Sequence, residues 1–438
     1  MNIVGLRQEE KAFETRVPVV PKHIMELSKK HRIQFIIEPS DQRAFDTNEF
    51  KEVGAEVGQL KGRNIPVILG IKEMPSDFFE KNTVYIFFSH TIKGQKQNMP
   101  MLKRILDVGA TLIDYERVVD EKGRRLIFFG NWAGMAGISD TFRVLGNRLD
   151  LKEITPNPFS GMKPTLQAKN LAELKEEFQH LGRRITDGGL PKHMIPFIVG
   201  FAGYGNASRG AQEMFDLLPH EEIQPEHISE IPNPKDNILY KCVFKEEHMV
   251  EPKDPTEDFI LQDYYKNGST KYRGVFHKYV PYLSILLNCI YWADKYPRLV
   301  TKSFIQEHWH KKSRKLEVIG DISCDVGGAI QFTTQTTNPG TPAFTYIVDE
   351  DRAELGVSGD GPVVMAVDNL PCELPRESST SFSETLLDFV PALAKADFKA
   401  PFEVLDLPRE LKNAVIVYQG ELTEDYKYLD QYLTAKEN

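Results

Sequence analysis

A glycine-rich turn, GYGNASRG over 203–210, follows the apolar segment MIPFIVGFAG and precedes the helix-like segment AQEMFDLL. Glycines here let the chain turn tightly and bring backbone N–H groups against a pyrophosphate, and the start of the helix adds its positive dipole end. The pattern predicts a dinucleotide site at Gly203, Gly205 and Ser208, although Ser208 replaces the usual third glycine and Gly210 is displaced. A strand-to-helix turn without a ligand is the alternative.

The same fingerprint expects an acidic residue about 20 residues beyond the glycines, at the adenosine ribose. That region is EEIQPE over 221–226, where no clear strand end singles out one acid. Arg209 is either a contact for a 2′-phosphate or a solvated side chain. These residues alone leave NAD and NADP undecided.

A second group combines a lysine, an acid and a histidine. Lys72 and Glu73 follow the apolar run VILGI, and His90 follows VYIFFS. Residues just past the carboxyl ends of neighbouring parallel strands meet at one edge of a sheet, so we expect Lys72 and His90 to share a site. A lysine of lowered pKa and a histidine can move protons at a carbonyl or imine. Taken singly, an exposed lysine and a surface or capping histidine are the ordinary alternatives.

Arginines at three positions are candidates for binding carboxylates, because guanidinium offers a planar, bidentate fork. Arg16 lies in ETRVPVVP, and Arg124 and Arg125 lie in DEKGRRLIFFGN. From the residues alone, a solvated arginine pair in a hairpin turn is the preferred interpretation.

The elements that must position these residues follow an α/β pattern, since short apolar runs rich in Val, Ile and Phe alternate with amphipathic segments. A first lobe to about residue 130 has a mostly parallel sheet. Residues 140–192 are interpreted as a connector. The predicted strands are 34–38, 67–70 and 84–88, and the predicted helices are 23–30, 101–108 with Gly109 as C-cap, and 171–184.

A second α/β lobe opens at Met194 with the strand before the glycine turn. The segment 222–280 is polar, punctuated by prolines and longer than an ordinary connection of about 4–6 residues, so we interpret it as an insertion. Further strands are predicted at 283–291, 318–322 and 363–367.

Composition excludes several classes of protein. The 438 residues are 41% hydrophobic and 27% charged, with a net charge of −9, which is typical of a globular chain of two to three domains. No run approaches the roughly 18 apolar residues of a membrane span, and the polar N-terminus does not resemble a secretory signal. We therefore expect a cytoplasmic protein that binds neither membrane nor nucleic acid. The four dispersed cysteines predict no metal site.

The order of the motifs resembles one family along essentially the whole chain. This family comprises the lysine-forming saccharopine dehydrogenases and the lysine–ketoglutarate reductase half of the bifunctional lysine-degradation enzyme, relatives of alanine dehydrogenase and transhydrogenase. The matching stretches are ETRVPVVP (14–21), GIKEMP (70–75), YIFFSHTIKGQKQNMP (85–100), LIDYERVVDEKGRRLIFFGNWAGMAG (112–137), GYGNASRGAQEMFDLLP (203–219), LNCIYW (287–292), DISCDVGGAIQF (321–332) and VDNLPCELPRES (367–378).

The resemblance implies an α/β fold with two Rossmann-like parallel-sheet lobes, an interlobe cleft and a discontinuous first lobe. Residues 1–190, completed by 371–438, would form a substrate domain similar to the N-terminal domain of alanine dehydrogenase and transhydrogenase. Residues 191–370 would form the NAD(P)-binding domain, with the insertion at about 222–280.

The resemblance also implies roles for individual residues. Lys72 would be the catalytic base and His90 the proton donor, while Asp368 would balance the charge of Lys72. Glu73 and Glu116 would lie by the amino groups of the substrate. Arg16, Gln95, Arg125 and Phe129 would line the rest of that site. Contacts to the cofactor would come from Arg124, Gly203, Gly205, Asn206, Ser208, Tyr291, Ile322, Ser323, Asp325, Asp368, Asn369 and Leu370.

The implied reaction joins L-lysine and 2-oxoglutarate to saccharopine with reduction by NAD(P)H, or runs in reverse. The resemblance favours NADP(H) over NAD(H). It implies a free-standing reductase, so a separate glutamate-forming saccharopine dehydrogenase is an expected partner. Two alternatives are a related amino-acid or opine-type imine reductase and a non-catalytic nucleotide-binding sensor, although a sensor needs no proton-transfer pair.

Overall fold

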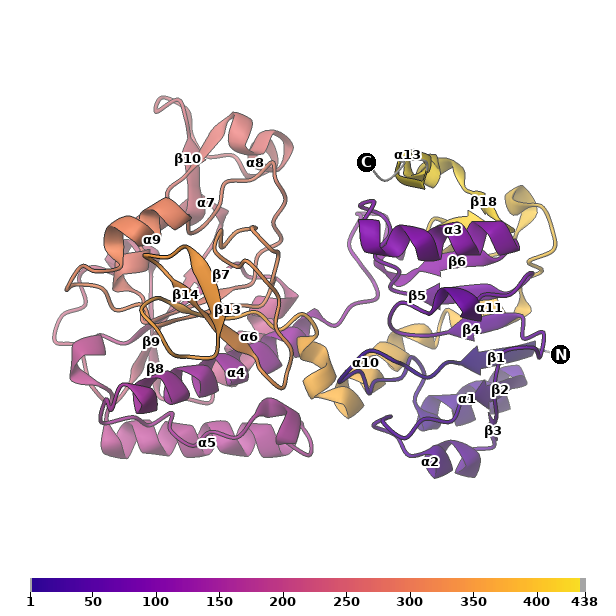
Figure 1. Cartoon of the computed structure of the whole chain (residues 1–438), viewed down its shortest axis with the longest axis horizontal. Helices are drawn as coiled ribbons and strands as arrows, with labels where there is room; N and C mark the ends of the chain where they lie inside the picture. The colour runs from indigo at the N-terminus through magenta and orange to yellow at the C-terminus, as the bar shows by residue number, and fades with distance from the viewer. Residues whose placement is uncertain (1, 434–438) are drawn as a thin grey trace. The chain divides into compact units, whose positions relative to one another are not determined.

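The structure is a computed structural model that describes residues 2–433. The chain divides into two compact units (Figure 1). Unit 1 comprises Met1–Phe129 and Pro375–Asn438, and unit 2 comprises Gly130–Leu374. Each unit contains its own eight-stranded sheet with helices packed on it.

The sheet of unit 1 has the order β18-β17-β6-β5-β4-β1-β2-β3. The six strands from β6 to β3 are parallel, and β17 and β18 add an antiparallel edge. The central strands β4, β5 and β6 are buried along their whole length, which explains the continuous apolar sequences of β4 and β5. The bounds are β1 (Asn2–Leu6), β2 (Ile33–Ile37), β3 (Glu56–Val57), β4 (Val67–Leu69), β5 (Val84–Phe87), β6 (Thr111–Asp114), β17 (Val415–Tyr418) and β18 (Glu421–Leu422).

The helices of unit 1 come from both ends of the chain. Gly109 ends α3 in the left-handed conformation, with φ of 74°, as the sequence predicted. Two serine hydroxyls of α10 accept the backbone N–H groups of Val17 and Val20 at 3.0 and 3.1 Å. The C-terminal segment is therefore part of this unit. The bounds are α1 (Pro21–His31), α2 (Thr47–Glu52), α3 (Met99–Val108), α10 (Pro375–Leu386), α11 (Val390–Lys395), α12 (Arg409–Lys412) and α13 (Asp430–Leu433).

The sheet of unit 2 has the order β15-β14-β16-β13-β12-β7-β9-β8. The strands from β16 to β8 are parallel, and β14 and β15 are antiparallel at the far edge. After β7 the chain builds β8 and β9 on one side and then crosses to β12 on the other. This reversal creates a topological switch point beside β7, where open α/β sheets bind ligands. The bounds are β7 (Ile198–Ala202), β8 (His220–Ile223), β9 (Leu239–Phe244), β12 (Ile285–Asn288), β13 (Val318–Asp321), β14 (Ala343–Ile347), β15 (Arg352–Leu355) and β16 (Val363–Met365).

A close crossing of two helices lies against this sheet. A Cβ on Gly134 of α4 would lie 1.9 Å from the carbonyl oxygen of Ala207, and one on Gly210 of α6 would lie 2.0 Å from that of Asn131. Gly210 therefore serves helix packing. The helices are α4 (Gly130–Leu151), α5 (Leu171–Gly188), α6 (Asn206–Phe215), α7 (Glu246–Met249), α8 (Leu261–Asn267) and α9 (Lys302–His308).

The structure assigns 130–190 to unit 2, whereas the sequence places these residues in the first domain and interprets 140–192 as a connector. The reason is packing: Phe142 of α4 stacks on Phe178 of α5 and meets Phe215 of α6, with ring centroids 5.9 and 6.4 Å apart. The chain returns to unit 1 at Pro375, four residues after the predicted position.

The segment predicted as an insertion, 222–280, is only partly one. It contains β9, which is the neighbour of β7 in the main sheet. The remainder holds α7, α8 and the separate antiparallel pair β10 (Val250–Pro252) and β11 (Tyr272–Gly274).

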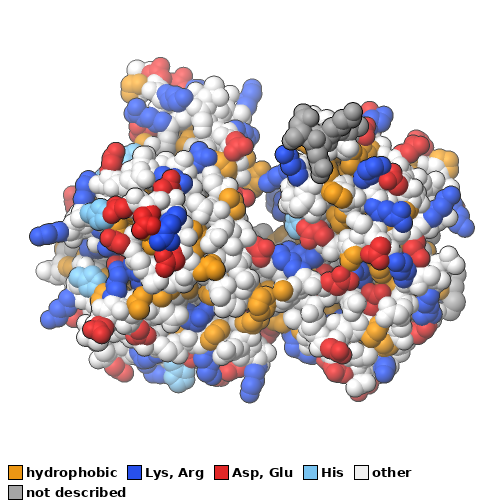
Figure 2. Space-filling model, viewed as in Figure 1, with side chains coloured by type: hydrophobic (Ala, Val, Ile, Leu, Met, Phe, Trp, Pro, Cys, Tyr) orange, Lys and Arg blue, Asp and Glu red, His pale blue; other side chains and the backbone are white. Residues whose placement is uncertain are grey.

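Within residues 2–433, no helix combines the length and apolarity needed to cross a membrane. Basic and acidic side chains are interspersed over the face of each unit drawn in Figure 2.

Candidate functional site

Lys72 lies in the loop after β4, where the sequence predicted it. The backbone N–H groups of Ile71 and Lys72 donate to the two carboxyl oxygens of Glu9, at 2.6 and 3.0 Å. Glu9 is 7% exposed and lies beyond the end of β1, the parallel neighbour of β4. It therefore fixes the loop that carries Lys72. Glu9 was not predicted from the sequence, although it too follows a strand.

Burial and neighbouring charge both favour a neutral amine on Lys72. Its desolvation lowers the pKa, the guanidinium of Arg16 lowers it further, and the carboxylate of Glu14 opposes this effect. Burial and the negative charge of Glu14 raise the pKa of Glu9 to about 7. A lysine in this setting can accept a proton, as the sequence hypothesis required.

His90 follows β5, the strand next to β4. Its Nδ1 is hydrogen-bonded to Oε1 of Glu73, and Asn98 Nδ2 donates to its carbonyl oxygen at 3.0 Å. Burial raises the pKa of Glu73, but the hydrogen bond and charge of His90 outweigh it and hold that pKa below its usual value. Glu73 is the next residue after Lys72 in the chain, and its carboxylate orients the imidazole of His90.

Arg16 is buried and paired. Its Nε donates to Glu14 at 2.7 Å, and its guanidinium lies 4.1 Å from the ring centroid of Phe129. Phe129 stacks on Phe382 of α10, with centroids 4.6 Å apart. Arg16 and Phe129, both predicted at the substrate, are therefore neighbours on a rigid aromatic support.

Glu116 and Arg125 form an ion pair with each other. Glu116 lies in the 3₁₀ turn η3 (Tyr115–Arg117), and Arg125 is half exposed. Arg124 is an exposed residue of the following turn, 120–124, and its Nε donates to Asp120 at 2.7 Å. Arg124 lies in unit 1, whereas the other residues expected at the cofactor lie in unit 2, so its contact with the cofactor stays a prediction.

Gln95 and Asp114 form hydrogen bonds within and between the loops that follow β5 and β6. The Oε1 of Gln95 accepts the N–H of Lys93 at 3.0 Å. Asp114, at the end of β6, accepts the N–H of Ser89 at 3.2 Å and that of Glu116 at 2.8 Å. Burial raises its pKa to about 6. Asp114 thus links the loop of His90 to that of Glu116. Its position directly after the apolar run TLI could have marked it as a candidate site residue in the sequence.

The glycine turn in unit 2 lies at the switch point and opens onto a cavity of about 430 Å³. Gly203 has φ of 94°, and a Cβ on Gly205 would meet no atom within 4 Å, so a ligand can approach the backbone closely. Gly205 is also the N-cap of α6, whose first N–H groups face the turn. These features fit a dinucleotide. The lining residues are Gly203, Tyr204, Gly205, Glu246, Met249, Tyr264, Tyr265, Cys289, Ile290, Tyr291 and Tyr296.

Asn206 and Ser208 are on α6, beyond this turn. The side chain of Asn206 is bonded by Arg209. Ser208 is buried, and its Oγ accepts Gln212 Nε2 at 2.9 Å, so its hydroxyl is used within the helix.

The loop after β13 carries three residues expected at the cofactor, Ile322, Ser323 and Asp325. The N–H of Ile322 donates to Asn288 at 3.1 Å, and the hydroxyl of Ser323 donates to the carbonyl oxygen of Ile290 at 2.5 Å. The ends of β12 and β13 are thereby joined next to Tyr291. At the end of β13, burial raises the pKa of Asp321 to about 6.

Asp368, Asn369 and Leu370 follow β16. Asn369 and Leu370 are buried, and Asp368 is exposed, with its N–H donating to the carbonyl oxygen of Thr337 at 3.2 Å. Asp368 belongs to unit 2 and Lys72 to unit 1, so the pairing of their charges stays a prediction.

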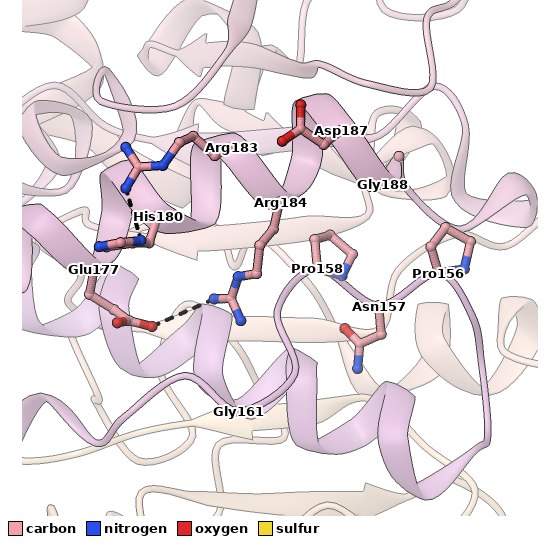
Figure 3. Close-up of a pocket in the computed structure, with 11 residues that line it drawn as sticks. Pro156, Asn157, Pro158, Gly161, Glu177, His180, Arg183, Arg184, Asp187 and Gly188 are labelled. Carbon is pink, nitrogen blue, oxygen red and sulfur yellow. Dashed lines mark hydrogen bonds and ion pairs between the residues drawn. The ribbon is translucent and has the colours of Figure 1, made fainter.

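A second cavity in unit 2, of about 910 Å³, lies between the loop 156–161 and α5 (Figure 3). Its charged groups bond one another: Arg183 contacts His180 at 2.8 Å and Arg184 contacts Glu177 at 3.5 Å. None of the residues predicted at the site is among those that line it.

Two domain families match this architecture. The N-terminal domain of alanine dehydrogenase/PNT matches residues 5–136, and the C-terminal domain of the same proteins matches residues 275–425. An L-alanine dehydrogenase structure is similar with a TM-score of 0.60 at 18% identity, covering 98% of both chains. A transhydrogenase from Sinorhizobium meliloti is similar with a TM-score of 0.54 at 14% identity, covering 96% of this chain and 98% of that one. The fold is therefore that of the alanine dehydrogenase and transhydrogenase class, as the resemblance predicted.

Sequence relatives narrow this class. The alpha-aminoadipic semialdehyde synthase of Arabidopsis thaliana is 36% identical over 98% of this chain and 41% of its own length. The mitochondrial enzyme of that name from Rattus norvegicus is 32% identical over 99% of this chain and 48% of its own length. The saccharopine dehydrogenase [NAD(+), L-lysine-forming] of Schizosaccharomyces pombe is 30% identical over 90% of this chain and 93% of its own length.

This chain belongs to the L-lysine-forming saccharopine dehydrogenase family, which confirms the resemblance seen in its motifs. It spans less than half the length of the plant and rat relatives.

Proposed function

We propose that the protein is an NAD(P)-dependent oxidoreductase of lysine metabolism. It joins L-lysine and 2-oxoglutarate to saccharopine by reductive condensation, or catalyses the reverse reaction. The observation that supports this most strongly is the arrangement of Lys72, Glu73 and His90 after two adjacent parallel strands, with the pKa of Lys72 lowered. A binding module has no use for such a proton-transfer pair.

The condensation needs a neutral amine, and an ordinary lysine amine has a pKa of about 10.4. Lys72 Nζ takes a proton from the ε-ammonium group of the substrate, so that the free amine attacks the keto carbon of 2-oxoglutarate. His90, oriented by Glu73 at its Nδ1, protonates the hydroxyl of the carbinolamine, which leaves as water. The coenzyme, when bound, would supply the hydride that reduces the resulting imine.

The substrates carry carboxylates and amino groups that need opposite charges. Arg16 and Arg125 offer guanidinium forks for carboxylates, with Gln95 and Phe129 beside the substrate. Glu73 and Glu116 receive its amino groups, and the family resemblance assigns to Asp368 the role of balancing the charge of Lys72. Because Arg16 and Arg125 already contact Glu14 and Glu116, substrate carboxylates would share or replace these bonds.

Unit 1 is proposed as the substrate domain and unit 2 as the NAD(P)-binding domain. The glycine turn, Asn206, Tyr291, the loop of Ile322, Ser323 and Asp325, and the loop of Asn369 and Leu370 would contact the coenzyme. The resemblance favours NADP(H) here. A separate glutamate-forming saccharopine dehydrogenase is the proposed consumer of saccharopine, and the cytoplasm is the proposed location.

The test follows oxidation of NADH and of NADPH by absorbance with lysine and 2-oxoglutarate, omitting each in turn. We expect turnover that needs both compounds and is lost in Lys72→Met and His90→Gln. Lys81→Met, at an exposed lysine, is the control and should retain activity. Turnover only with other amines or keto acids would indicate a related imine reductase, and coenzyme binding without any turnover would indicate a sensor.

A further inference from the structure

His90 follows β5 with its backbone in the left-handed region, at φ of 48°. This region is uncommon for a residue with a side chain, because Cβ lies too close to the following carbonyl oxygen. Such a conformation persists where the surrounding structure fixes it. The contacts that hold this backbone therefore decide where the imidazole points.

Both sequence neighbours of His90 belong to one chain of hydroxyl groups. The Oγ of Ser89 lies 2.7 Å from Oγ1 of Thr91, and the Ser89 hydroxyl donates to Oδ2 of Asp114. The backbone N–H of Ser89 donates to the same oxygen at 3.2 Å. Since the one proton of Ser89 Oγ is used on the carboxylate, Thr91 is the donor to Ser89. Ser89, Thr91 and Asp114 are all fully buried, so a hydrogen bond lost among them would not be replaced by water.

The carbonyl oxygen of His90 is fixed from another element. Asn98, at the end of the 3₁₀ turn η2 (Lys96–Asn98), donates its Nδ2 to this oxygen at 3.0 Å. Asn98 is itself buried, and its backbone N–H donates to the carbonyl oxygen of Gln95 at 2.9 Å. With the backbone fixed on both sides, the imidazole of His90 is directed at Glu73.

The second carboxyl oxygen of Asp114 reaches the neighbouring loop. Its Oδ1 accepts the N–H of Glu116 at 2.8 Å, and the side chain of Glu116 pairs with Arg125. The two loops begin side by side because β5 and β6 are parallel neighbours, with Phe87 opposite Asp114. One buried carboxylate therefore joins the loop of the proposed proton donor to a loop proposed to bind the substrate.

The negative charge of Asp114 suits its three donors, because an ionised carboxylate only accepts hydrogen bonds. Burial raises its pKa to about 6, although the hydrogen bonds from Ser89 and Glu116 oppose this effect. At pH 8 the carboxylate is charged. An amide in its place would keep the size but turn one acceptor into a donor, which would face an N–H group.

We propose that Asp114 is a positioning residue for the proton donor His90. Through the hydroxyl groups of Ser89 and Thr91, its carboxylate holds the backbone of His90 in the left-handed conformation that directs the imidazole at its partner. This inference deepens the proposed function and rests on it for the role of His90. The alternative is that Asp114 only stabilises the fold.

Two variants of Thr91 separate hydrogen bonding from packing. Thr91→Val keeps the shape of the side chain and removes its hydroxyl, whereas Thr91→Ser keeps the hydroxyl and removes a methyl group. With lysine and 2-oxoglutarate at pH 8, Thr91→Val should lower kcat at least about tenfold, and Thr91→Ser should stay within about twofold of wild type. The opposite ranking would show that Thr91 acts by packing and would overturn the proposal.

Asp114→Asn breaks the chain of hydrogen bonds at its anchor. It should lower kcat about 10–100-fold and raise the solvent deuterium isotope effect on kcat, because proton transfer from a misplaced imidazole is slower. Coenzyme binding should stay unchanged, because the glycine turn belongs to unit 2. Asp107→Asn, at an exposed acid of α3, is the matched control and should behave as wild type. A fall in kcat with an unchanged isotope effect would indicate a merely structural role and would overturn the proposal.

A measurement without substrates makes the test independent of the proposed reaction. In protein that carries isotope-labelled histidine, the magnetic resonance signals of the His90 ring are those absent from His90→Gln. They should shift or broaden in Thr91→Val and Asp114→Asn, and keep their wild-type positions in Thr91→Ser and Asp107→Asn. Unchanged His90 signals in a folded Asp114→Asn protein would overturn the proposal.

Resonance and turnover together separate this inference from the proposed function. If the His90 signals respond as expected but lysine and 2-oxoglutarate give no turnover, the proposed reaction fails and the positioning of His90 by Asp114 stands. If the reaction proceeds and Asp114→Asn retains the wild-type kcat, the role of Asp114 fails and the reaction stands.

Discussion

At the scale of single residues, Glu9 links folding stability to pH. Its pKa is raised from 4.5 to about 7, so its ionisation destabilises the fold as pH rises from about 5 and the cost is complete above about 7. Glu9→Gln removes this titration. The free energy of unfolding of wild type minus that of the variant should therefore fall by about 2 kcal/mol between pH 5 and pH 8.

Urea unfolding at both pH values measures this difference. Glu10→Gln, at the exposed adjacent acid, is the control and should show no comparable change with pH. Because Glu9 also fixes the loop of Lys72, Glu9→Gln should lower kcat about tenfold at pH 8, or about 1.4 kcal/mol in the barrier. A pH-independent difference in stability would contradict the raised pKa.

Arg16 is the second residue whose geometry makes a sharp prediction. Arg16→Lys keeps the charge but loses the fork to Glu14 and the flat contact with Phe129. Since Glu14 is fully buried, we expect a loss of about 2 kcal/mol in the free energy of unfolding and a higher KM for 2-oxoglutarate. Arg104→Lys, at an exposed position of α3, should change neither quantity, and equal behaviour of the two variants would refute the assignment.

At the scale of elements, the crossing of α4 and α6 holds the start of α6 against the sheet. Gly210→Ala places a methyl group 2.0 Å from a backbone carbonyl oxygen, so the helices must separate. We expect a loss of about 2–3 kcal/mol in stability and weaker NAD(P)H binding, because the glycine turn shifts with α6.

Gly188→Ala is the matched control for this crossing. It also lies in a helix, α5, where an added Cβ would meet no atom within 4 Å, so helix propensity should raise its stability by up to about 1 kcal/mol. Urea unfolding and titration with NADH and with NADPH compare both variants. A Gly210→Ala protein as stable as wild type would show that the two helices can move apart freely.

The elements also show which parts of the fold could be predicted from sequence. The strands β4 and β5 were found because buried parallel strands are continuous apolar runs, and the positions of Lys72 and His90 followed from them. The helix α4 was missed because its glycines and buried polar residues obscure the helical periodicity of its apolar residues. The close packing of α4 on α6 nevertheless requires a glycine at position 134. Likewise β9 was missed because it lies within a polar, proline-rich stretch.

Contacts between residues far apart in the sequence could not be predicted from local sequence patterns. Glu9 meets the backbone of Lys72 across 63 positions, and Ser379 accepts the N–H of Val17 across 362. Neither Glu9 nor Ser379 stands out from the residues around it in sequence. The role of Glu9 depends on the pairing of β1 with β4, and that of Ser379 depends on the packing of α10 in unit 1.

At the scale of the whole molecule, the chain passes from unit 1 to unit 2 after Phe129 and returns at Pro375. Unit 2 is continuous and contains all eight strands of its sheet, whereas unit 1 needs both ends of the chain. The core of unit 1 includes Phe382 and Leu386 of α10, and β17 pairs with β6.

These facts predict different behaviour of fragments. A fragment of residues 130–374 should fold and bind NAD(P)H, because its core and the glycine turn are complete. A fragment of residues 1–129 should not unfold cooperatively in urea, because it lacks the apolar side chains of α10, α11 and β17 and leaves β6 as an exposed edge. Mixing it with a 375–438 fragment should restore cooperativity. Cooperative unfolding of 1–129 alone, measured by circular dichroism, would show that these residues fold without the C-terminal segment.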